Sequence, residues 1–317
     1  MTEAGWVFKD QKQEREVAMD DRKMTTTTNQ PSATMQTVRD ATCQLLREFG
    51  MTTFFGNVGS TEETFLRNFP SDFRYVLGLQ EASVIAMADG FAQATALTDL
   101  LGERKPRTGK TREKIAHRMA PHPPSRAKES GDGLLTAAQV FDVLGEIRPA
   151  NAILVEESPS NLADLHKSWP ITEPASFFTF ASGGLGWNMP ASVGIALGER
   201  EMGRNRPVIM IIGDGSFQYS LQSIWTGAQL RLPILIVVLR NDEYCILKSF
   251  AKLEETPGVP GLDLPDIDIV SLAKGYGCDA ARLDDLDSIK KAAVEAWTKS
   301  KPTVLEIPIS PQVPSLL

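Results

Sequence analysis

The sequence predicts an α/β protein, with a doubly wound parallel sheet in the later part of the chain and a partial second α/β domain before it. Short runs of β-branched or apolar residues recur between residues 134 and 317, and such runs are typical of buried parallel strands. Amphipathic stripes of helical period lie between some of them. The 317 residues, 42% of them hydrophobic, provide enough apolar mass for one or two cores.

The later part of the chain alternates strand and helix signals with little interruption. One helix is expected to start at Phe217, because an apolar stripe continues at helical spacing to Ala228. A second stripe runs from Ile289 to Trp297. Six strands with helices between them form a doubly wound sheet of ordinary domain size. The expected strands are 152–155, 176–180, 207–212, 234–239, 280–283 and 303–307.

The earlier part of the chain has a shorter pattern of the same kind. Two parallel strands with three helices bury little apolar surface, and a two-stranded sheet is marginal alone. This fragment therefore either docks on something or folds only in part. Its expected elements are helices at 37–49, 62–67 and 81–94 and strands at 52–55 and 75–79.

A basic segment divides these two parts. Residues 101–130 hold nine basic and three acidic side chains, with four prolines and no aromatic residue among them. Without interleaved aromatics the segment favours a solvated linker over a nucleic-acid surface. The expected organisation is a disordered leader over 1–35, a partial domain over 36–97, a linker over 98–133 and the main domain over 134–317.

Composition excludes several classes of protein. The longest apolar runs are far shorter than the roughly 20 residues that span a bilayer. The three cysteines show no C-x-x-C spacing, so neither a disulfide framework nor a thiolate zinc site is indicated. The acidic N-terminal segment lacks the apolar stretch of a secretory signal. A cytoplasmic protein without nucleic-acid or membrane partners is expected.

The main chemical signal is the segment Gly213-Asp214-Gly215-Ser216, between a predicted strand and a predicted helix. A glycine turn at a helix N-terminus is typical of a phosphate site. An acidic residue there would repel phosphate unless a divalent cation lay between them. Asn241 ends the next strand, so it is expected beside Asp214 at the carboxyl edge of the sheet. The alternative is a tight turn with Asn241 capping a strand end.

Gly213-Asp214-Gly215, followed after 25 residues by Asn241, resembles the diphosphate and metal motif of thiamine-diphosphate enzymes. Further strings are similar to the benzoylformate decarboxylase branch of that family, and the resemblance covers about 36–96 and 134 to the end. These strings are F-R-Y-V-L-G-L-Q-E-A (73–82), F-A-S-G-G-L-G (180–186), G-D-G-S-F-Q-Y-S (213–220) and V-P-G-L-D-L-P-D-I-D (259–268).

The resemblance implies the thiamine-diphosphate-binding fold, with thiamine diphosphate and Mg²⁺ as cofactors. It also implies non-oxidative decarboxylation of an aromatic 2-oxo acid such as benzoylformate, which gives an aldehyde and CO₂. In this match Asp214, Asn241 and the backbone carbonyl of Glu243 are the metal ligands. Gly215 and Ser216 lie at the diphosphate.

Several apolar positions also match the family. Leu185, in the turn Gly183-Gly184-Leu185-Gly186, matches the bulky residue that wedges the cofactor into its bent shape. Tyr244, Leu247 and Phe250 match residues that line the cofactor and substrate pocket, although apolar residues after a strand are more often core. A nicotinamide-binding interpretation of the same glycine turn fails, because no third glycine follows at the required spacing.

Two residues of the earlier part match catalytic positions. Glu81 matches the carboxylate that hydrogen-bonds the aminopyrimidine ring of the cofactor, and it is also an ordinary first-turn glutamate. Ser60 matches a residue that contacts the substrate carboxylate, and with Glu63 it also forms a capping-box pattern. In the family the two parts of the site come from different chains, so the resemblance implies a homodimer.

The chain also departs from the family pattern. The middle domain and the latter half of the pyrimidine-binding domain are missing, and none of the histidines, His117, His122 and His166, matches a proton-transfer position. Asp242 and Glu243 place two added carboxylates beside the diphosphate. The alternatives are therefore a truncated, catalytically impaired cofactor-binding remnant, or another member such as an acetolactate synthase or a 2-hydroxyacyl-CoA lyase.

Overall fold

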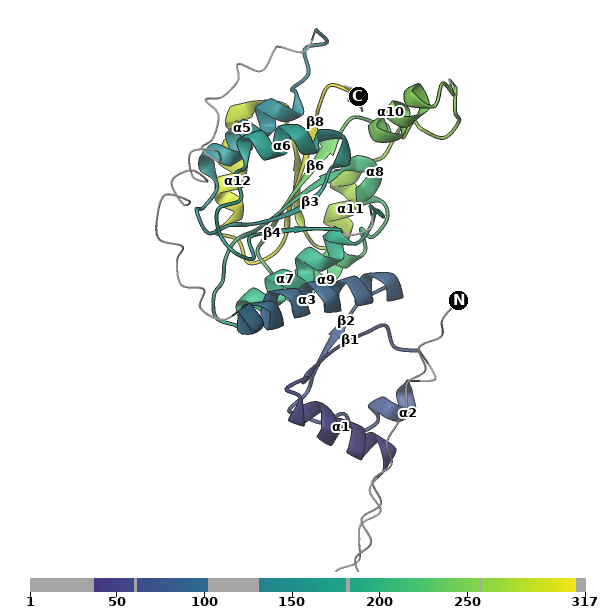
Figure 1. Cartoon of the computed structure of the whole chain (residues 1–317), viewed down its shortest axis with the longest axis vertical. Helices are drawn as coiled ribbons and strands as arrows, with labels where there is room; N and C mark the ends of the chain where they lie inside the picture. The colour runs from purple at the N-terminus through teal and green to yellow at the C-terminus, as the bar shows by residue number, and fades with distance from the viewer. Residues whose placement is uncertain (1–36, 60–61, 102–130, 181–182, 257, 312–317) are drawn as a thin grey trace, which may run out of the picture.

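The computed structural model describes residues 37–59, 62–101, 131–180, 183–256 and 258–311. The fold class is the predicted one, a doubly wound parallel α/β sheet preceded by a smaller α/β unit (Figure 1). The predicted leader and most of the predicted linker lie outside the described residues, as does Ser60.

The larger sheet has six parallel strands in the order β4-β3-β5-β6-β8-β7. Each strand starts within one residue of its predicted start. The four central strands are buried along almost their whole length, which explains their continuous apolar sequences. The strands are β3 (Ile153–Glu157), β4 (Phe177–Thr179), β5 (Val208–Gly213), β6 (Ile234–Arg240), β7 (Asp279–Arg282) and β8 (Thr303–Pro308).

Helices cover both faces of this sheet. On one face α5, α6 and α12 pack through Phe141 and Ile289 against strand residues such as Ile211. On the other face α7, α9 and α11 pack through Val193 against residues such as Met210 (Figure 1). The helices are α5 (Ala137–Ile147), α6 (Leu162–Ser168), α7 (Asn188–Glu201), α8 (Asp214–Phe217), α9 (Ser223–Gln229), α10 (Cys245–Leu253), α11 (Ile269–Gly275) and α12 (Leu286–Ala296), with a 3₁₀ turn, η1 (Pro159–Asn161), before α6.

The predicted helix from Phe217 to Ala228 is wrong as a single element. The chain forms α8, then turns, and α9 begins at Ser223. Through the turn the backbone bonds span three residues instead of four, as in Tyr219 N–H to the carbonyl of Ser216. Both Phe217 and Ile224 remain fully buried. The apolar spacing therefore marked the buried side chains correctly but did not reveal the interruption.

The earlier part forms a two-stranded parallel sheet with three helices. The N-cap of its short middle helix is Glu62, without a side-chain capping bond, and the capping box predicted from Ser60 lies outside the described residues. The third helix runs to Leu101, beyond the predicted end. The elements are α1 (Val38–Glu48), β1 (Thr53–Gly56), α2 (Glu63–Leu66), β2 (Arg74–Leu77) and α3 (Glu81–Leu101).

This smaller unit docks on the larger one. α3 lies along α7 (Figure 1), and Met87 and Ala94 of α3 belong to the same buried apolar cluster as Val193 and Leu197 of α7. The core of the larger domain therefore continues into the smaller unit. In the described part of the chain, no helix is long and apolar enough to cross a membrane.

Candidate functional site

The carboxyl ends of β5 and β6 meet at one edge of the larger sheet. Gly213 pairs with Leu239, so the residues that follow the two strands lie side by side. The backbone N–H groups of Asn241 and Asp242 donate to Oδ2 of Asp214, at 3.1 and 2.7 Å. The structure thus brings the carboxylate of Asp214 into contact with the backbone of Asn241, the residue that supplies the other predicted side-chain ligand.

Asp214 is a buried carboxylate held by backbone groups. The side chain is 3% exposed, and its Oδ1 accepts the N–H of Gly215 at 2.9 Å. Burial raises the pKa of this carboxyl, while the backbone N–H groups of Asp242, Gly215 and Asn241 act in the opposite direction. Each carboxylate oxygen can accept two bonds, so Oδ1 keeps a lone pair that a cation can use.

A set of side-chain contacts fixes the loop after β6. Oδ1 of Asn241 accepts the N–H of Glu243 at 3.2 Å, and its Nδ2 donates to Sγ of Cys245 at 3.1 Å. The Cys245 thiol donates to Oε1 of Glu243 at 2.7 Å, and burial raises the pKa of that thiol well above its ordinary value. An antiparallel bridge joins Glu243 to Asp263. These contacts hold the backbone that the resemblance assigns to the metal.

Each of the two added carboxylates at this edge has a cationic partner. Asp242 pairs with Nε of Arg240 at 2.7 Å, and Glu243 forms an ion pair with Lys248. The sequence predicts that these carboxylates weaken diphosphate binding unless they turn to solvent. The Asp242 side chain is 55% exposed and so turns partly to solvent, whereas that of Glu243 is only 13% exposed. The neighbouring cations offset the charge of both.

The Gly183-Gly184-Leu185-Gly186 turn connects β4 to α7. Gly183 and Gly186 have φ values of +74° and +101°, which favour glycine. A Cβ on Gly186 would come within 2.9 Å of Cβ of Tyr219. Gly184 is exposed and Leu185 is half-buried, so the apolar side chain is only partly covered by protein.

A buried glutamate that the sequence analysis missed holds this turn. The Glu157 carboxylate, at the end of β3, accepts the N–H of Gly186 at 2.6 Å and the N–H of Asn188 at 2.9 Å. Its side chain is fully buried, and burial raises its pKa to about 7. No local signal could reveal this role, because its partners lie about 30 residues away in sequence.

Two tyrosines join the glycine turn to the Asp214 turn. Tyr219 lies against Gly186 and hydrogen-bonds Tyr244, whose phenol pKa is raised by burial and by Tyr219. The Tyr244 ring lies over Gly215, where a Cβ would come within 2.4 Å of Cε1. Gly215 is therefore needed for close approach, and the predicted cofactor residues form one continuous region.

The oxygen donors at this edge fit a hard divalent cation. Mg²⁺ prefers oxygen ligands and usually retains water or phosphate oxygens, so one carboxylate, one carboxamide and one carbonyl suffice from the protein. Among the described residues, no group of three or more His, Cys, Asp or Glu side chains could hold a metal without such added ligands.

Three polar side chains in the segment after the Asp214 turn have buried atoms without a described partner. Nε2 of Gln218 and Oγ of both Ser220 and Ser223 are buried just beyond the Asp214 turn, and no described residue partners them. Unpartnered buried polar atoms cost free energy, so water or a polar group that reached them would be favourable.

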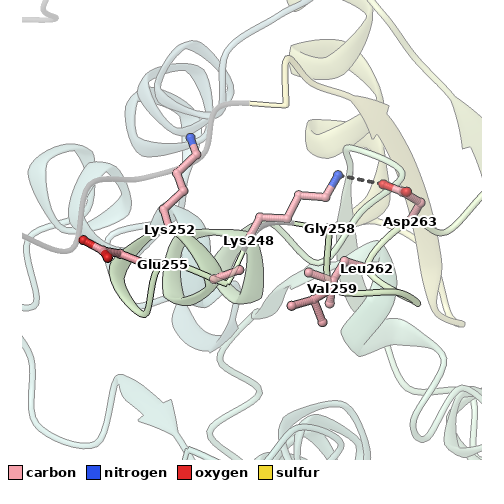
Figure 2. A pocket seen from close by; sticks show the side chains of 8 residues that line it. Lys248, Lys252, Glu255, Gly258, Val259, Leu262 and Asp263 are labelled. Carbon is pink, nitrogen blue, oxygen red and sulfur yellow. Dashed lines mark hydrogen bonds and ion pairs between the residues drawn. The ribbon is translucent and has the colours of Figure 1, made fainter.

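A cavity of about 530 Å³ lies beside this edge, between α10 and the segment after it (Figure 2). Nζ of Lys248 points to Asp263 across it, at 2.7 Å, and Val259 and Leu262 supply apolar walls. None of the predicted cofactor residues lines the cavity. Its contribution to the site is therefore indirect, through the Lys248 bridge between Glu243 and Asp263.

Comparison with protein families identifies two modules in this chain. Residues 36–99 match the N-terminal TPP-binding domain of thiamine pyrophosphate enzymes, and residues 160–307 match the C-terminal TPP-binding domain. Together these matches cover most of the described chain. The chain belongs to the thiamine pyrophosphate enzyme family.

Two curated members of this family show how much of each sequence aligns with this chain. The chain is 36% identical to benzoylformate decarboxylase of Pseudomonas aeruginosa over 72% of its own length and 42% of that protein. It is 25% identical to acetolactate synthase of Bacillus subtilis over 39% of its own length and 21% of that protein. The chain thus spans less than half the length of these curated relatives.

A solved member of the family has the same fold. The crystal structure of benzoylformate decarboxylase from Polynucleobacter necessarius superposes with a TM-score of 0.78 at 26% identity. The match covers 89% of this chain and 100% of that one. The similarity confirms the thiamine-pyrophosphate-enzyme fold of both modules.

Four predicted residues remain to be placed: Ser60, Glu81, Leu247 and Phe250. Ser60 lies outside the described residues. Glu81 is exposed at the first position of α3. Leu247 and Phe250, 45% and 47% exposed, present apolar surface on α10. The roles of all these residues in this family member stay predictions.

Proposed function

We propose that this chain binds thiamine diphosphate with Mg²⁺ at the carboxyl edge of its larger sheet. In this proposal the carboxylate of Asp214, the carboxamide of Asn241 and the backbone carbonyl of Glu243 hold the cation. The observation that carries the proposal is the contact of the Asp214 carboxylate with the backbone N–H groups of Asn241 and Asp242, which supports a shared position for these residues at the sheet edge.

We further propose that the reaction is decarboxylation of an aromatic 2-oxo acid, such as benzoylformate, to an aldehyde and CO₂. The bound cofactor would supply the carbon centre that accepts the electrons of the breaking bond. The similarity to benzoylformate decarboxylase supports this substrate class. The exposed apolar surface of Leu247 and Phe250 suits an aromatic ring and would exclude water from it.

Glu81 would hold a proton in this reaction and exchange it with the cofactor's aminopyrimidine ring. Its exposed position at the start of α3 leaves the carboxylate free to meet a ligand. Tyr244, over Gly215, would shield the diphosphate side of the site from solvent.

A second candidate is a chain that binds the cofactor without turnover. His166, the one histidine in the described part of the chain, lies on α6 with its ring 5.5 Å from that of Phe177. General acid-base catalysis contributes about 10²- to 10⁴-fold to a rate, so a chain without a suitable proton donor would lose that factor.

An assay of aldehyde and CO₂ separates the candidates. The chain is supplied with thiamine diphosphate, Mg²⁺ and benzoylformate, and Glu81→Gln is compared with Glu48→Gln, an exposed glutamate of α1. We expect benzaldehyde from the wild type and Glu48→Gln, and a loss of at least about 100-fold in Glu81→Gln. Cofactor binding without product from any aromatic 2-oxo acid would favour the second candidate, and acetolactate formed from pyruvate would indicate a synthase.

A further inference from the structure

The Glu157 carboxylate is fully buried, and its hydrogen-bond partners are two backbone N–H groups. Among the described residues, no basic side chain pairs with it. By contrast, the buried carboxylate of Glu199 pairs with Arg204 and Arg206. A carboxylate buried without a cation costs free energy that a glutamine of the same size would largely avoid. Departures of this kind are expected at functional sites.

The two bonds of Glu157 span the end of the glycine turn. Its Oε1 accepts the N–H of Gly186 at 2.6 Å, and its Oε2 accepts the N–H of Asn188, the first residue of α7, at 2.9 Å. Gly186 also lies against Tyr219, because a Cβ on this glycine would come within 2.9 Å of the tyrosine Cβ. The end of the turn is therefore held by a carboxylate and a tyrosine.

Fixing the N–H of Gly186 also restricts Leu185. This N–H belongs to the same rigid, trans peptide plane as the carbonyl of Leu185, so that carbonyl points away from the Glu157 carboxylate. The Cα of Leu185 lies in the same plane, and the direction of its side chain is restricted as well. Leu185 is half-buried, and it matches the bulky residue that the family places against the cofactor.

We propose that Glu157 is a positioning residue of the cofactor site, and that its carboxylate sets the place of Leu185 against bound thiamine diphosphate. The inference rests on the proposed function, because Leu185 meets the cofactor only if this edge binds it. Two acceptor oxygens are needed, one for each N–H group. A glutamine has the same size, but its Nε2 is a donor, so one N–H would lose its acceptor.

A double-mutant cycle tests whether Glu157 acts through Leu185. The affinity for thiamine diphosphate with Mg²⁺ is measured by calorimetry for the wild type, Glu157→Gln, Leu185→Ala and the double variant. We expect Glu157→Gln to weaken binding about tenfold, since a buried N–H loses its partner. Leu185→Ala should have an effect of about the same size, since it removes buried apolar contact.

The double variant decides between an indirect and an independent role. Its affinity should lie within about twofold of that of Leu185→Ala, because without the leucine there is nothing left for Glu157 to position. Losses that multiply would overturn the action through Leu185. Unchanged affinity in either single variant would overturn the proposal.

Glu199→Gln is the matched control for general destabilisation. Glu199 is 1% exposed and lies near the C-terminal end of α7, where it pairs with Arg204 and Arg206 and not with the turn. This change should lower the free energy of unfolding in urea but leave the cofactor affinity within about twofold of the wild type. An equal loss of affinity in Glu199→Gln and Glu157→Gln would overturn the proposal, because destabilisation alone would then explain both.

Hydrogen exchange tests the contact without the cofactor. In the wild type the amides of Gly186 and Asn188 should exchange at least about tenfold more slowly than that of the exposed Gly184. Glu157→Gln should speed exchange at one or both of these amides and leave that of Ile153, in β3, unchanged. The wild-type comparison holds even if the variant fails to fold. Equal exchange at the three turn amides in the wild type would overturn the contact.

The cofactor titration separates a failure of this inference from a failure of the proposed function. A wild type that binds no thiamine diphosphate would overturn the proposed function, and the role of Glu157 with it. Binding to the wild type that is unchanged in Glu157→Gln would overturn only the role of Glu157.

Discussion

The two units of this molecule bury their apolar residues in different ways. One of the two apolar clusters of the larger domain, around the fully buried Phe141 and Leu154, is built from residues of that domain alone. Its other cluster continues into the smaller unit. The smaller unit leaves Val38, Phe49 and Met51 86%, 69% and 59% exposed. Its most deeply buried apolar side chains, Val76, Met87 and Ala94, belong to a cluster that it shares with the larger domain. We infer that the larger domain is stable by itself and that docking stabilises the smaller unit.

The largest expected effect distinguishes the cores of the two units. Phe141→Ala removes a fully buried ring from the larger domain, and Phe73→Ala removes a 7% exposed ring from the aromatic cluster of the smaller one. Each change should cost about 3–5 kcal/mol. Phe141→Ala should increase hydrogen exchange throughout the described chain, whereas Phe73→Ala should increase it only within residues 37–101. Equal exchange patterns in the two variants would show that the units unfold together.

The second-largest expected effect on stability comes from the contact between α3 and α7. Gly194→Ala should force α3 away from α7, at a cost of about 1–3 kcal/mol or more, because the new Cβ would meet the carbonyl oxygen of Met87. Limited proteolysis should then cut the smaller unit while the larger domain persists. Gly275→Ala is the matched control, since a Cβ there meets nothing within 4 Å. Unchanged protection of the smaller unit in Gly194→Ala would contradict the docking.

Glu157 makes the stability of the larger domain depend on pH. Burial raises its pKa to about 7 from the ordinary 4.5, so between these values the folded chain keeps a proton that the unfolded chain releases. The free energy of unfolding should therefore fall as pH rises through this range and level off above it. Across this pH range the free energy of unfolding of the wild type should fall by up to about 3 kcal/mol more than that of Glu157→Gln.

Urea unfolding at intervals from pH 4.5 to 8 measures this difference. Glu146→Gln is the control, because that glutamate is 67% exposed and its removal should leave the pH dependence as in the wild type. Glu156 is also buried and has a raised pKa, but it is present in the wild type and in both variants. Parallel curves for wild type and Glu157→Gln would mean that Glu157 titrates normally.

The smallest effect concerns the ion pair between the units. Arg74 and Glu201 have side chains 34% and 41% exposed, so water screens their attraction. Arg74→Ala should lower the protection of the smaller unit by about 0.2–1 kcal/mol. A double-mutant cycle with Glu201→Ala measures the coupling. A value well above 1 kcal/mol would indicate that this pair, and not the helix contact, holds the units together.

Sequence reasoning was most successful where the signal is local. The strands of the larger sheet are short apolar runs between polar turns, so each start could be predicted within one residue. The proximity of Asp214 and Asn241 followed from a general property of parallel strands. The family strings then identified both modules.

Contacts between distant segments could not be predicted in the same way. Glu157 meets Gly186 and Asn188 through tertiary structure alone. The docking of α3 depends on Gly90 and Gly194, which lie in different helices. The small residues Ala86, Gly90 and Ala94, spaced four apart in the sequence, were the available signal for a close helix contact.

The most direct test of the cofactor site is a titration of the full chain with thiamine diphosphate in the presence and absence of Mg²⁺. Binding is followed by tryptophan fluorescence, because Trp187 adjoins the glycine turn. Asp214→Asn removes a proposed ligand, and Asp242→Asn is the same change at a neighbouring, 55% exposed side chain. We expect saturable, Mg²⁺-dependent binding to the wild type and Asp242→Asn, weakened at least about tenfold in Asp214→Asn. No binding to the wild type at millimolar cofactor, or equal binding to Asp214→Asn, would contradict the assignment of this edge as the cofactor site.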